Sequence, residues 1–434
     1  MQNPFTYGQP VSPDRFVGRR SEIQAAFDQI YNRSNLALWG GPAMGKTSFL
    51  EFLASPQVWQ KYGQDPSQAV IVLLSCESIQ PFTASGFWQE VLSLIQEELH
   101  SEPDLQEQIE TLLNQGKATT RGMRQVLKQL RKRHKFLLLL VDDYDWALRE
   151  NPHYTHADME TFVNECRSIA YQSLERRYLS MIVASLRPLN ELGPALNPNS
   201  SPWYNHYLFQ SLKPFTDRDI DQLMAGMPIT PELRGLIREI AGGHPALLQI
   251  VGSLLYRELK TGKVPDAQAF VQDFEGITRP IFETIWKRCS QVEQALLILM
   301  ALFKLDSRLH HNKHFNLRGI EVIFIQNQRE LTNLVERGVI TKQNQQGMMI
   351  SHQDLLFTSS IMERWLIQEL WQTNNPLLED RQKVFLNLLS HSQAHQVTEA
   401  IKWISQHQEK VQTALPWVSK VSGVFPLTSN GSKP

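Results

Sequence analysis

Short apolar runs alternate with helix-like segments over the first two hundred or so residues. The runs typical of buried strands are 35–39, 69–74, 136–141, 179–184 and 207–209. The segments between them carry apolar residues at helical spacing, which is the pattern of a parallel sheet covered by helices. The pattern therefore predicts an α/β domain over residues 1–212, with a parallel sheet and helices on both faces.

Beyond residue 216 the strand pattern gives way to helical spacing. Residues 218–224 and 231–240 are predicted helices, and the break Gly242-Gly243-His244-Pro245 separates them from another helix. We expect a small helical domain over residues 213–270.

A further helical region follows. Residues 279–303 are predicted as one long helix, and 320–325 and 328–337 as two shorter ones. The apolar residues 338–340 and 348–350 flank a polar run and resemble a hairpin. Helices followed by a small hairpin predict a winged-helix domain over residues 271–372.

The last segment, 373–434, is predicted as helical with a polar tail. Its helical part carries an apolar stripe, formed by Val397, Ala400, Ile401, Ile404, Val411 and Leu415. Packing onto the preceding domain is favoured over an exposed docking helix.

Composition narrows the class of protein. Hydrophobic residues make up 42%, charged residues 20%, and the formal net charge is −1, so the total charge does not indicate a nucleic-acid or membrane partner. Three widely separated cysteines form neither a disulfide framework nor a metal pair, and are interpreted as core thiols. The first residues resemble no secretory signal and no run is long enough to span a bilayer, so we expect a cytoplasmic protein.

One motif carries the chemistry. The run from Gly40 to Thr47 reads Gly-Gly-Pro-Ala-Met-Gly-Lys-Thr between an apolar strand and a helix. Such a loop presents backbone N–H groups and a helix N-terminus to phosphates, its lysine reaches the β- and γ-phosphates, and its threonine binds Mg²⁺. The run therefore predicts an ATP/ADP site with magnesium.

A second acidic motif supports that prediction. The apolar run 136–141 ends in Asp142 and Asp143. Asp142 is expected to bind magnesium, and Asp143 to polarise the attacking water or contact the γ-phosphate. Asp142 follows Thr47 by 95 positions, so the strand before the loop and the strand before Asp142 are not sequential.

These motifs together resemble the STAND class of signal-transduction ATPases, related to the AAA+ and NACHT groups. Further support comes from Val17-Gly18-Arg19 with Glu22, from 182–188, from Gly242-Gly243-His244-Pro245, and from 334–340 with Phe357 and Trp365. The resemblance spans roughly residues 3–370. It implies an α/β P-loop NTPase followed by a helical lid, a winged-helix domain and a short C-terminal helical region.

The resemblance also implies roles for residues. The segment before the loop lines the adenine side, Ser185 or Arg187 faces the γ-phosphate, and Pro245 packs on the base. Lys46, Asp143 and Arg187 are the expected catalytic residues, and Thr47 and Asp142 the expected metal ligands. The expected nucleotide-binding residues are Phe16, Val17, Gly18, Arg19, Gly40, Gly41, Pro42, Ala43, Met44, Gly45, Lys46, Thr47, Ser48, Ser185 and Pro245.

Some of these residues have plainer interpretations. Arg187 could cap a strand or pair with an acid, and His244 is more often a packed histidine than a phosphate sensor. The cations between Lys128 and Lys135 end a helix, where they suit its dipole.

Three functions are compatible with these motifs. The first is a slow ATPase switch, whose ADP or ATP state controls domain opening, homo-oligomerisation or binding of a protein partner. The second is an AAA+ ATPase that acts on DNA through its winged helix, as in origin recognition or transposition. The predicted recognition helix 328–337 pairs Arg329 and Arg337 with Glu330 and Glu336, which disfavours DNA. The third is an inactive nucleotide-binding scaffold.

Overall fold

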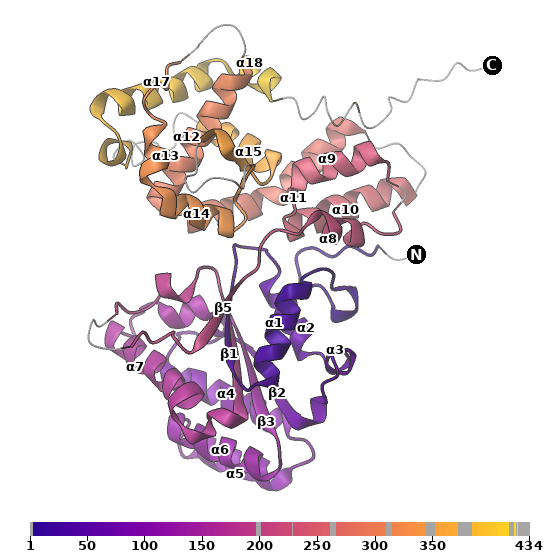
Figure 1. Cartoon of the computed structure of the whole chain (residues 1–434), viewed down its shortest axis with the longest axis vertical. Coiled ribbons are helices and arrows are strands. Elements are labelled where there is room, and N and C mark those ends of the chain that lie inside the picture. Colours follow the sequence, from indigo (N-terminus) through magenta and orange to yellow (C-terminus); the bar gives the residue numbers. More distant parts are fainter. Residues whose placement is uncertain are drawn as a thin grey trace, which may run out of the picture. The chain divides into compact units, whose positions relative to one another are not determined.

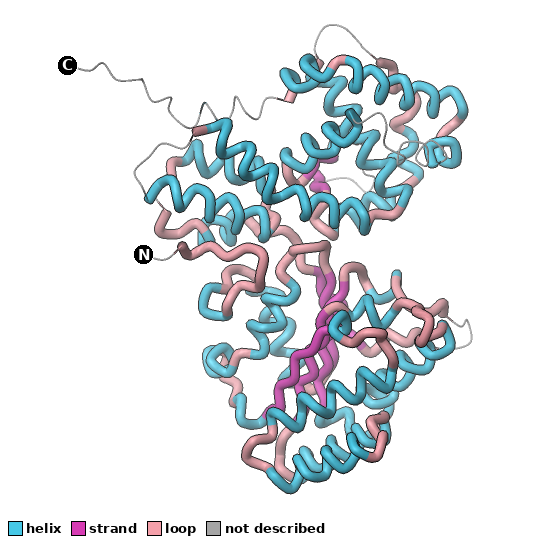
Figure 2. The backbone as a smooth tube through the Cα atoms, turned by 180° about the vertical axis from the view of Figure 1, so that it is seen from behind, coloured by secondary structure: helices cyan, strands magenta, loops and turns pink. Residues whose placement is uncertain are grey.

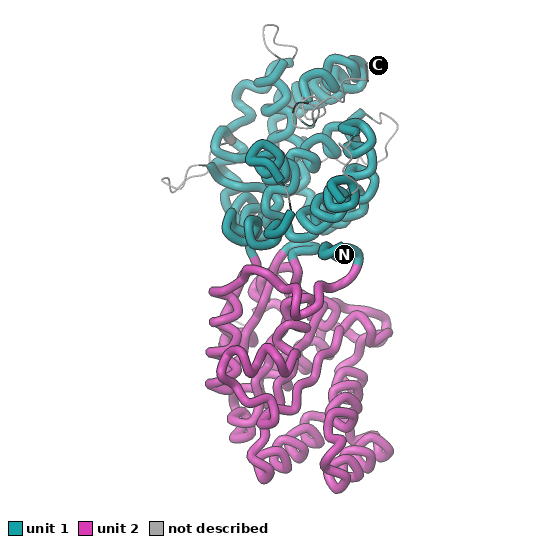
Figure 3. The backbone as a smooth tube through the Cα atoms, turned by 90° about the vertical axis from the view of Figure 1, so that its right-hand side faces the viewer, with its two compact units in different colours: residues 1–8, 41–44, 213–434 teal, residues 9–40, 45–212 magenta. Residues whose placement is uncertain are grey.

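The chain forms two compact units in a computed structural model that describes residues 3–196, 201–227, 229–260, 266–309, 315–343, 352–371, 384–415, 421 and 423. Unit 1 comprises residues 1–8, 41–44 and 213–434, and unit 2 comprises residues 9–40 and 45–212 (Figure 3). Residues 213–434 are not divided further by their contacts, and helix α11 (Ala267–Arg288) runs across the boundary expected at residue 270.

Unit 2 is built on a five-stranded sheet with the order β2-β3-β4-β1-β5, in which every neighbouring pair is parallel. Its strands are β1 (Asn35–Trp39), β2 (Ala69–Ser75), β3 (Phe136–Asp142), β4 (Leu179–Ser185) and β5 (Tyr207–Ser211). Strand β4 lies between β1 and β3. The prediction that the strand before the loop and the strand before Asp142 are not sequential is therefore confirmed.

Helices cover both faces of this sheet (Figure 2). One face is covered by α1 (Arg20–Tyr31), α2 (Lys46–Ala54) and α3 (Pro56–Lys61). The other is covered by α4 (Ala84–Glu98), α5 (Pro103–Asn114), α6 (Thr120–Lys132) and α7 (His156–Arg167). Because both faces of the central strands are buried, those strands are continuous apolar runs rather than alternating ones.

Four strands extend past their predicted ends. The observed strands β2, β3 and β4 include Ser75, Asp142 and Ser185, and β5 continues to Ser211. Each of these polar residues therefore stands at the carboxyl end of a parallel strand. That edge of such a sheet is where ligands bind in open α/β folds.

Unit 1 is mainly helical and surrounds one apolar core (Figure 1). Besides α11, its helices are α8 (Asp217–Leu223), α9 (Pro231–Ala241), α10 (Pro245–Lys260), α12 (Gln291–Arg308), α13 (Val322–Gln326), α14 (Gln328–Glu336), α15 (Ser360–Trp371), α17 (His391–Gln406) and α18 (Gln408–Ala414). Two short strands, β6 (Ile340–Lys342) and β7 (Leu355–Phe357), form an antiparallel pair.

The predicted single helix over 279–303 is wrong. The structure has α11 and α12 there, separated at Cys289 and Ser290. Ser290 caps α12, because its hydroxyl accepts the Glu293 N–H while the Glu293 carboxylate accepts the Ser290 N–H. This reciprocal cap starts a new helix inside an otherwise continuous helical spacing.

The predicted hairpin is only partly described. Strand β6 pairs with β7, whereas the expected second strand at 348–350 lies outside the described residues. The apolar stripe of the C-terminal helices is buried, from Val397 in α17 to Leu415 after α18, which confirms that it packs in a core. Cys76, Cys166 and Cys289 are also buried and free, as predicted.

The N-terminal segment belongs to unit 1. The Asn3 amide donates to the Ser253 hydroxyl at 2.9 Å, the Thr6 N–H donates to the Gln249 side chain at 3.0 Å, and the Phe5 ring lies against Gly252. Glycine at 252 leaves the room that this ring occupies. Across the described segments, the helices are all too short or too polar to cross a membrane.

Candidate nucleotide site

The loop between β1 and α2 has the backbone of an anion-binding site. Ala43 and Gly45 adopt left-handed conformations, with φ of 57° and 87°, and α2 begins at Lys46. Such turns direct successive N–H groups toward one side, where they meet the positive end of a helix dipole. The Lys46 ammonium donates to the Gly40 carbonyl at 2.9 Å, which holds the cation against the loop.

Thr47 and Asp142 are brought together, although 95 positions separate them. The Thr47 hydroxyl donates to Asp142 Oδ2 at 2.5 Å. Asp142 ends β3 and is only 4% exposed, and its other oxygen accepts the Asp143 N–H at 2.9 Å. The two expected magnesium ligands therefore lie side by side.

The backbone conformation of Asp143 and a hydrogen bond from the neighbouring strand β2 orient its side chain. Its φ is 49°, a left-handed conformation that a residue with a side chain adopts at a cost of about 1 kcal/mol. Its carboxylate accepts a hydrogen bond from the Ser75 hydroxyl at 2.8 Å, and Ser75 is paired in register with Asp142. The expected catalytic acid is thus held at the carboxyl end of the sheet.

A third acid, Asp145, was not predicted. It is buried, and its carboxylate accepts the Leu186 N–H at 2.9 Å, just after β4. Burial raises the pKa of its carboxyl, although the Leu186 hydrogen bond opposes this. Its place three residues after Asp142 was the available signal, since each added acid at one strand end increases the local negative charge.

The electrostatics of this site fit a magnesium ion. Burial raises the pKa of Asp142, the Thr47 hydrogen bond lowers it, and the charge of Asp143 raises it again. On α2, the pKa of Glu51 is raised by burial and by the charge of Asp142. A buried carboxylate with a hydroxyl beside it and further acids nearby is an oxygen ligand set, which Mg²⁺ prefers.

Ser185 is the last residue of β4, the strand between β1 and β3, and Arg187 follows two residues later. The Gly40 N–H donates to the Ser185 carbonyl at 3.2 Å, which joins the loop to the end of β4. The Ser185 hydroxyl is fully buried and donates to the Arg187 carbonyl at 2.7 Å, so it stabilises the turn after β4. The contact of either side chain with a γ-phosphate stays a prediction.

The segment 16–19 lies against α2. The Phe16 ring stacks on Phe52 with 4.6 Å between centroids, and Gly18 and Arg19 have φ of 73° and 60°. The Arg19 side chain is buried and pairs with Glu22 at 3.5 Å. This pair stabilises the start of α1.

Ser48 and Val17 are two further residues expected to bind the nucleotide. The Ser48 hydroxyl accepts the Val11 N–H at 3.0 Å, so it holds the segment before α1. Val17 precedes the left-handed turn at Gly18 and is partly exposed. The binding of nucleotide by either residue is not tested and stays a prediction.

Four loop residues, Gly41, Pro42, Ala43 and Met44, are grouped with unit 1. Within that unit, a Cβ at Gly41 would lie 2.6 Å from the Arg337 backbone oxygen, so only glycine fits there. A Cβ at Gly338 would lie 3.3 Å from the Met44 methyl group. The turn after α14 therefore packs against the tip of the loop.

Pro245 is the other expected site residue in unit 1. It is the first residue of α10, after Gly242 and Gly243, whose φ values are 55° and 79°. The Gly243 carbonyl accepts the Phe215 N–H at 2.8 Å, and His244 is only 3% exposed, which fits the interpretation of His244 as a packed histidine. The contact of Pro245 with a base stays a prediction.

Several basic residues between Lys128 and Lys135 form ion pairs with acidic side chains, and so does Arg337. Arg133 and Lys135 both pair with Glu102, at 2.5 and 2.6 Å, and Lys128 pairs with Glu175 at 3.6 Å. Arg337, which the sequence suggested as part of a DNA-contacting surface, is buried and pairs with Glu293 at 2.6 Å. Arg337 therefore adds no exposed cation to the predicted recognition helix 328–337, which agrees with the preference against DNA.

The chain is similar to known proteins in its three-dimensional structure, but not in sequence. No known family model matches the sequence, and no curated protein matches it either. A Walker-type ATPase of Pyrococcus abyssi is similar in fold, with a TM-score of 0.52 and 14% identity over 84% of this chain and 99% of its own. The ORC2 protein of Aeropyrum pernix, solved with ADPNP and ADP, has a TM-score of 0.50 and 12% identity over 85% of this chain and 98% of its own.

These likenesses and the strand order agree on the fold. A five-stranded parallel sheet with a glycine-rich loop after β1 and an acid at the end of β3 defines the fold of an α/β P-loop NTPase. At such identities the similarity extends to the fold alone.

Proposed function

We propose that the chain binds and hydrolyses ATP and acts as a STAND-type molecular switch. The observation that carries the ATPase part is the hydrogen bond between Thr47 and Asp142, because it joins two oxygen ligands beside the Lys46 ammonium. The solved ORC2 relative with bound ADPNP and ADP supports a nucleotide as the ligand.

Each residue has a role in this proposal. The loop N–H groups and Lys46 bind the phosphates, while Thr47 and Asp142 hold magnesium, which neutralises phosphate charge when bound. Asp143, fixed by Ser75, orients the attacking water and accepts its proton. Arg187 and Ser185 respond to the γ-phosphate, Phe16 to Arg19 border the adenine, and Pro245 packs on the base.

The switch part rests on the packing of Gly41 against Arg337. The loop tip that would contact phosphates also contacts the turn between α14 and β6, in the proposed winged-helix domain. Phosphates that reshape the loop would thereby alter that domain. We propose that ADP keeps this contact and that ATP releases it, which opens the protein for homo-oligomerisation or for a cytoplasmic protein partner.

The test is the particle mass with ADP and with a non-hydrolysable ATP analogue. We expect a monomer with ADP and a larger particle with the analogue, and no increase for Lys46→Ala. The same mass in both states would rule out the oligomerising switch. Phosphate release by the wild type but not by Asp142→Asn separately tests hydrolysis and excludes an inactive scaffold.

A second candidate is an ATPase that acts on DNA, which the likeness to an ORC2 protein favours. The burial of Arg337 and the pairing of Arg133 and Lys135 with Glu102 leave fewer cations for phosphates. Salt-dependent binding of duplex DNA by the wild type, lost when Lys128, Arg131 and Lys132 are changed to Gln, would make this candidate the better one.

A further inference from the structure

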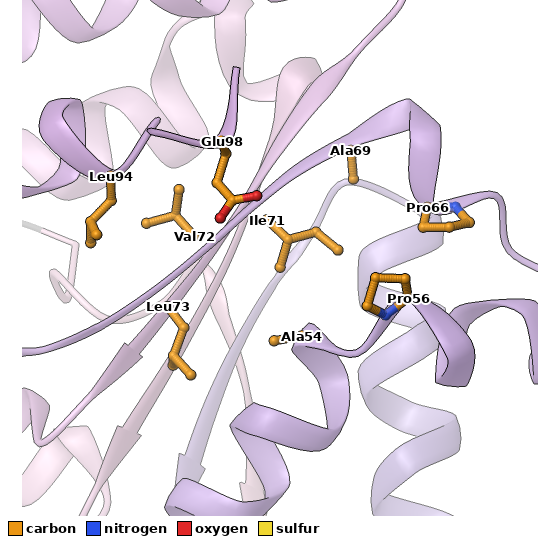
Figure 4. A pocket seen from close by; sticks show the side chains of 9 residues that line it. All are labelled: Ala54, Pro56, Pro66, Ala69, Ile71, Val72, Leu73, Leu94 and Glu98. Atoms are coloured by element: carbon orange, nitrogen blue, oxygen red, sulfur yellow. The ribbon is translucent and has the colours of Figure 1, made fainter. Parts of the chain in front are cut away.

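The outer edge of β2 is open. Strand β2 is the last strand of the sheet and pairs with β3, and among the described residues no other strand pairs with it. Alternate residues of an edge strand direct their N–H and C=O groups away from the sheet. A groove of about 430 Å³ follows this edge, and Ile71, Val72 and Leu73 form its floor (Figure 4).

This edge lacks the usual protection. Natural edge strands carry charged residues or proline, which prevent other chains from pairing with them. Strand β2 reads Ala-Val-Ile-Val-Leu-Leu-Ser from Ala69 to Ser75, with neither, and it is seven residues long. Ile71 and Leu73 are partly exposed. An apolar strand of this kind, left bare, is an aggregation site, so a specific occupant is expected.

The groove is recessed between helices. Ala54 and Pro56, at the junction of α2 and α3, line one side, and Leu94 and Glu98 of α4 line the other (Figure 4). Pairing requires the incoming strand to approach within about 4.8 Å of β2. A second copy of β2 is flanked by the same walls, which would collide first. A single extended segment without flanking helices can enter.

Charge defines the occupant further. Glu98 is the charged residue that lines the groove, it is exposed, and it forms no ion pair in the described part of the chain. Its carboxylate therefore favours a cation on the incoming segment, next to side chains that are small or apolar.

We propose that this groove binds an extended segment of a partner protein, which pairs with β2 as a sixth strand and places a lysine or arginine beside Glu98. Backbone hydrogen bonds supply the affinity, and alternate side chains of the segment fit the apolar floor. The site lies wholly within unit 2 and does not depend on the proposed switch.

The experiment uses the full chain and two labelled nine-residue peptides. Both alternate threonine and valine, and they differ in a central lysine or glutamate. We expect saturable binding of the lysine peptide by fluorescence anisotropy. Glu98→Lys should weaken that peptide and strengthen the glutamate peptide, each by about two- to fivefold, because an exposed pair is worth up to about 1 kcal/mol.

Two further variants make the result specific. Glu97→Lys carries the same charge change on the next residue of α4, outside this groove, and should leave the preference of the protein unchanged. Leu73→Lys should abolish binding of both peptides. In the complex, amide hydrogen exchange should slow at alternate residues of β2.

Several outcomes would overturn the proposal. One is the absence of saturable binding up to about 1 mM peptide, a weak affinity of about 4 kcal/mol. Another is binding that Leu73→Lys leaves unchanged. A third is self-association of the wild type that Leu73→Lys abolishes, since the occupant would then be a second copy. Unchanged melting of Glu98→Lys shows that the charge test does not depend on a folding defect.

Discussion

The two units bury polar side chains for different purposes. In unit 2 the buried acid Asp142 ends β3, the buried acid Asp145 follows it by three residues, and burial raises the pKa of both. In unit 1 the buried acid Glu293 pairs with Arg337 and also caps α12. One unit holds acids whose charge a ligand would balance, whereas the other balances its charges internally.

Because of this difference, substitutions of the acids in unit 2 should affect ligand binding, whereas substitutions of the ion pair in unit 1 should affect folding stability. Neutralising an acid of the first kind removes a ligand contact and relieves a desolvation cost. Neutralising an acid of the second kind leaves its partner cation buried and unpaired. The two kinds of residue should therefore respond in opposite ways to similar substitutions.

The largest effect is expected for hydrolysis. Lys46→Ala and Asp142→Asn should each lower the rate of phosphate release from ATP by about 100-fold or more, because each removes charge stabilisation from the transferring phosphate. Lys61→Ala, at the exposed end of α3, is the matched control and should hydrolyse ATP at the wild-type rate. Equal activity of Lys46→Ala and the control would contradict the site.

The next effect concerns the ion pair of unit 1. Arg337→Met should destabilise this unit by about 3–5 kcal/mol, because the substitution removes the cation of a buried ion pair. Hydrogen exchange of amides in α12 and α14 reports on this unit alone.

Arg279→Met provides the comparison within unit 1. Arg279 forms exposed pairs with Glu283 and Glu369, each at 3.0 Å, and their loss should cost about 1 kcal/mol or less. If Arg337→Met lost no more stability than Arg279→Met, the contrast between the units would be removed.

A smaller effect is expected from the ligand. Magnesium-ATP at about 100 times its Kd should stabilise unit 2 by about 2.7 kcal/mol, measured by exchange of amides in β1 and β3. Chelating magnesium should reduce the gain, and Lys46→Ala should abolish it. If ATP slowed exchange equally in Lys46→Ala, the stabilisation would come from another site.

The smallest effect is on the pH dependence of folding. Because burial raises the pKa of Asp142, this carboxyl without nucleotide holds its proton more strongly in the folded than in the unfolded chain above the ordinary pKa of 3.8. Stability from this group is therefore present at low pH and is lost as the pH rises through the folded pKa. Asp142→Asn should flatten this decline, as seen in unfolding curves from about pH 4 to 7.

Asp145 keeps part of that slope, since its pKa is raised by burial too. The informative quantity is therefore the difference between the wild type and Asp142→Asn at each pH. An identical slope in both proteins would show that Asp142 is not protonated more readily in the folded state.

The nucleotide loop and the sheet were predictable because their signals are local. Glycines, a lysine and a threonine at fixed spacing after an apolar strand define the loop, and the acids that end 136–141 mark the facing strand. The strand order followed in part from the separation of Thr47 and Asp142. Such patterns depend on neighbouring residues in the sequence.

The remaining features were missed either because residues far apart in the sequence determine them or because a local signal was overlooked. The burial of Arg337 was not predicted, because its partner Glu293 lies 44 positions earlier, on another helix. The break at Ser290 was hidden because helical apolar spacing continues across it, and the Ser290–Glu293 cap was overlooked. The groove beside β2 depends on which strand ends the sheet, which only the strand order determines.

The N-terminal segment has one more consequence. Residues 1–8, 41–44 and 213–434 form one unit, so unit 2 lies along the sequence between parts of unit 1. Asn3 and Phe5 connect the start of the chain to Ser253 and Gly252, far along the sequence. A fragment that begins at residue 213 would lack this segment and expose the surface beneath Phe5. An internal deletion that joins residue 8 to residue 213 through a short linker is the better way to produce the helical unit alone.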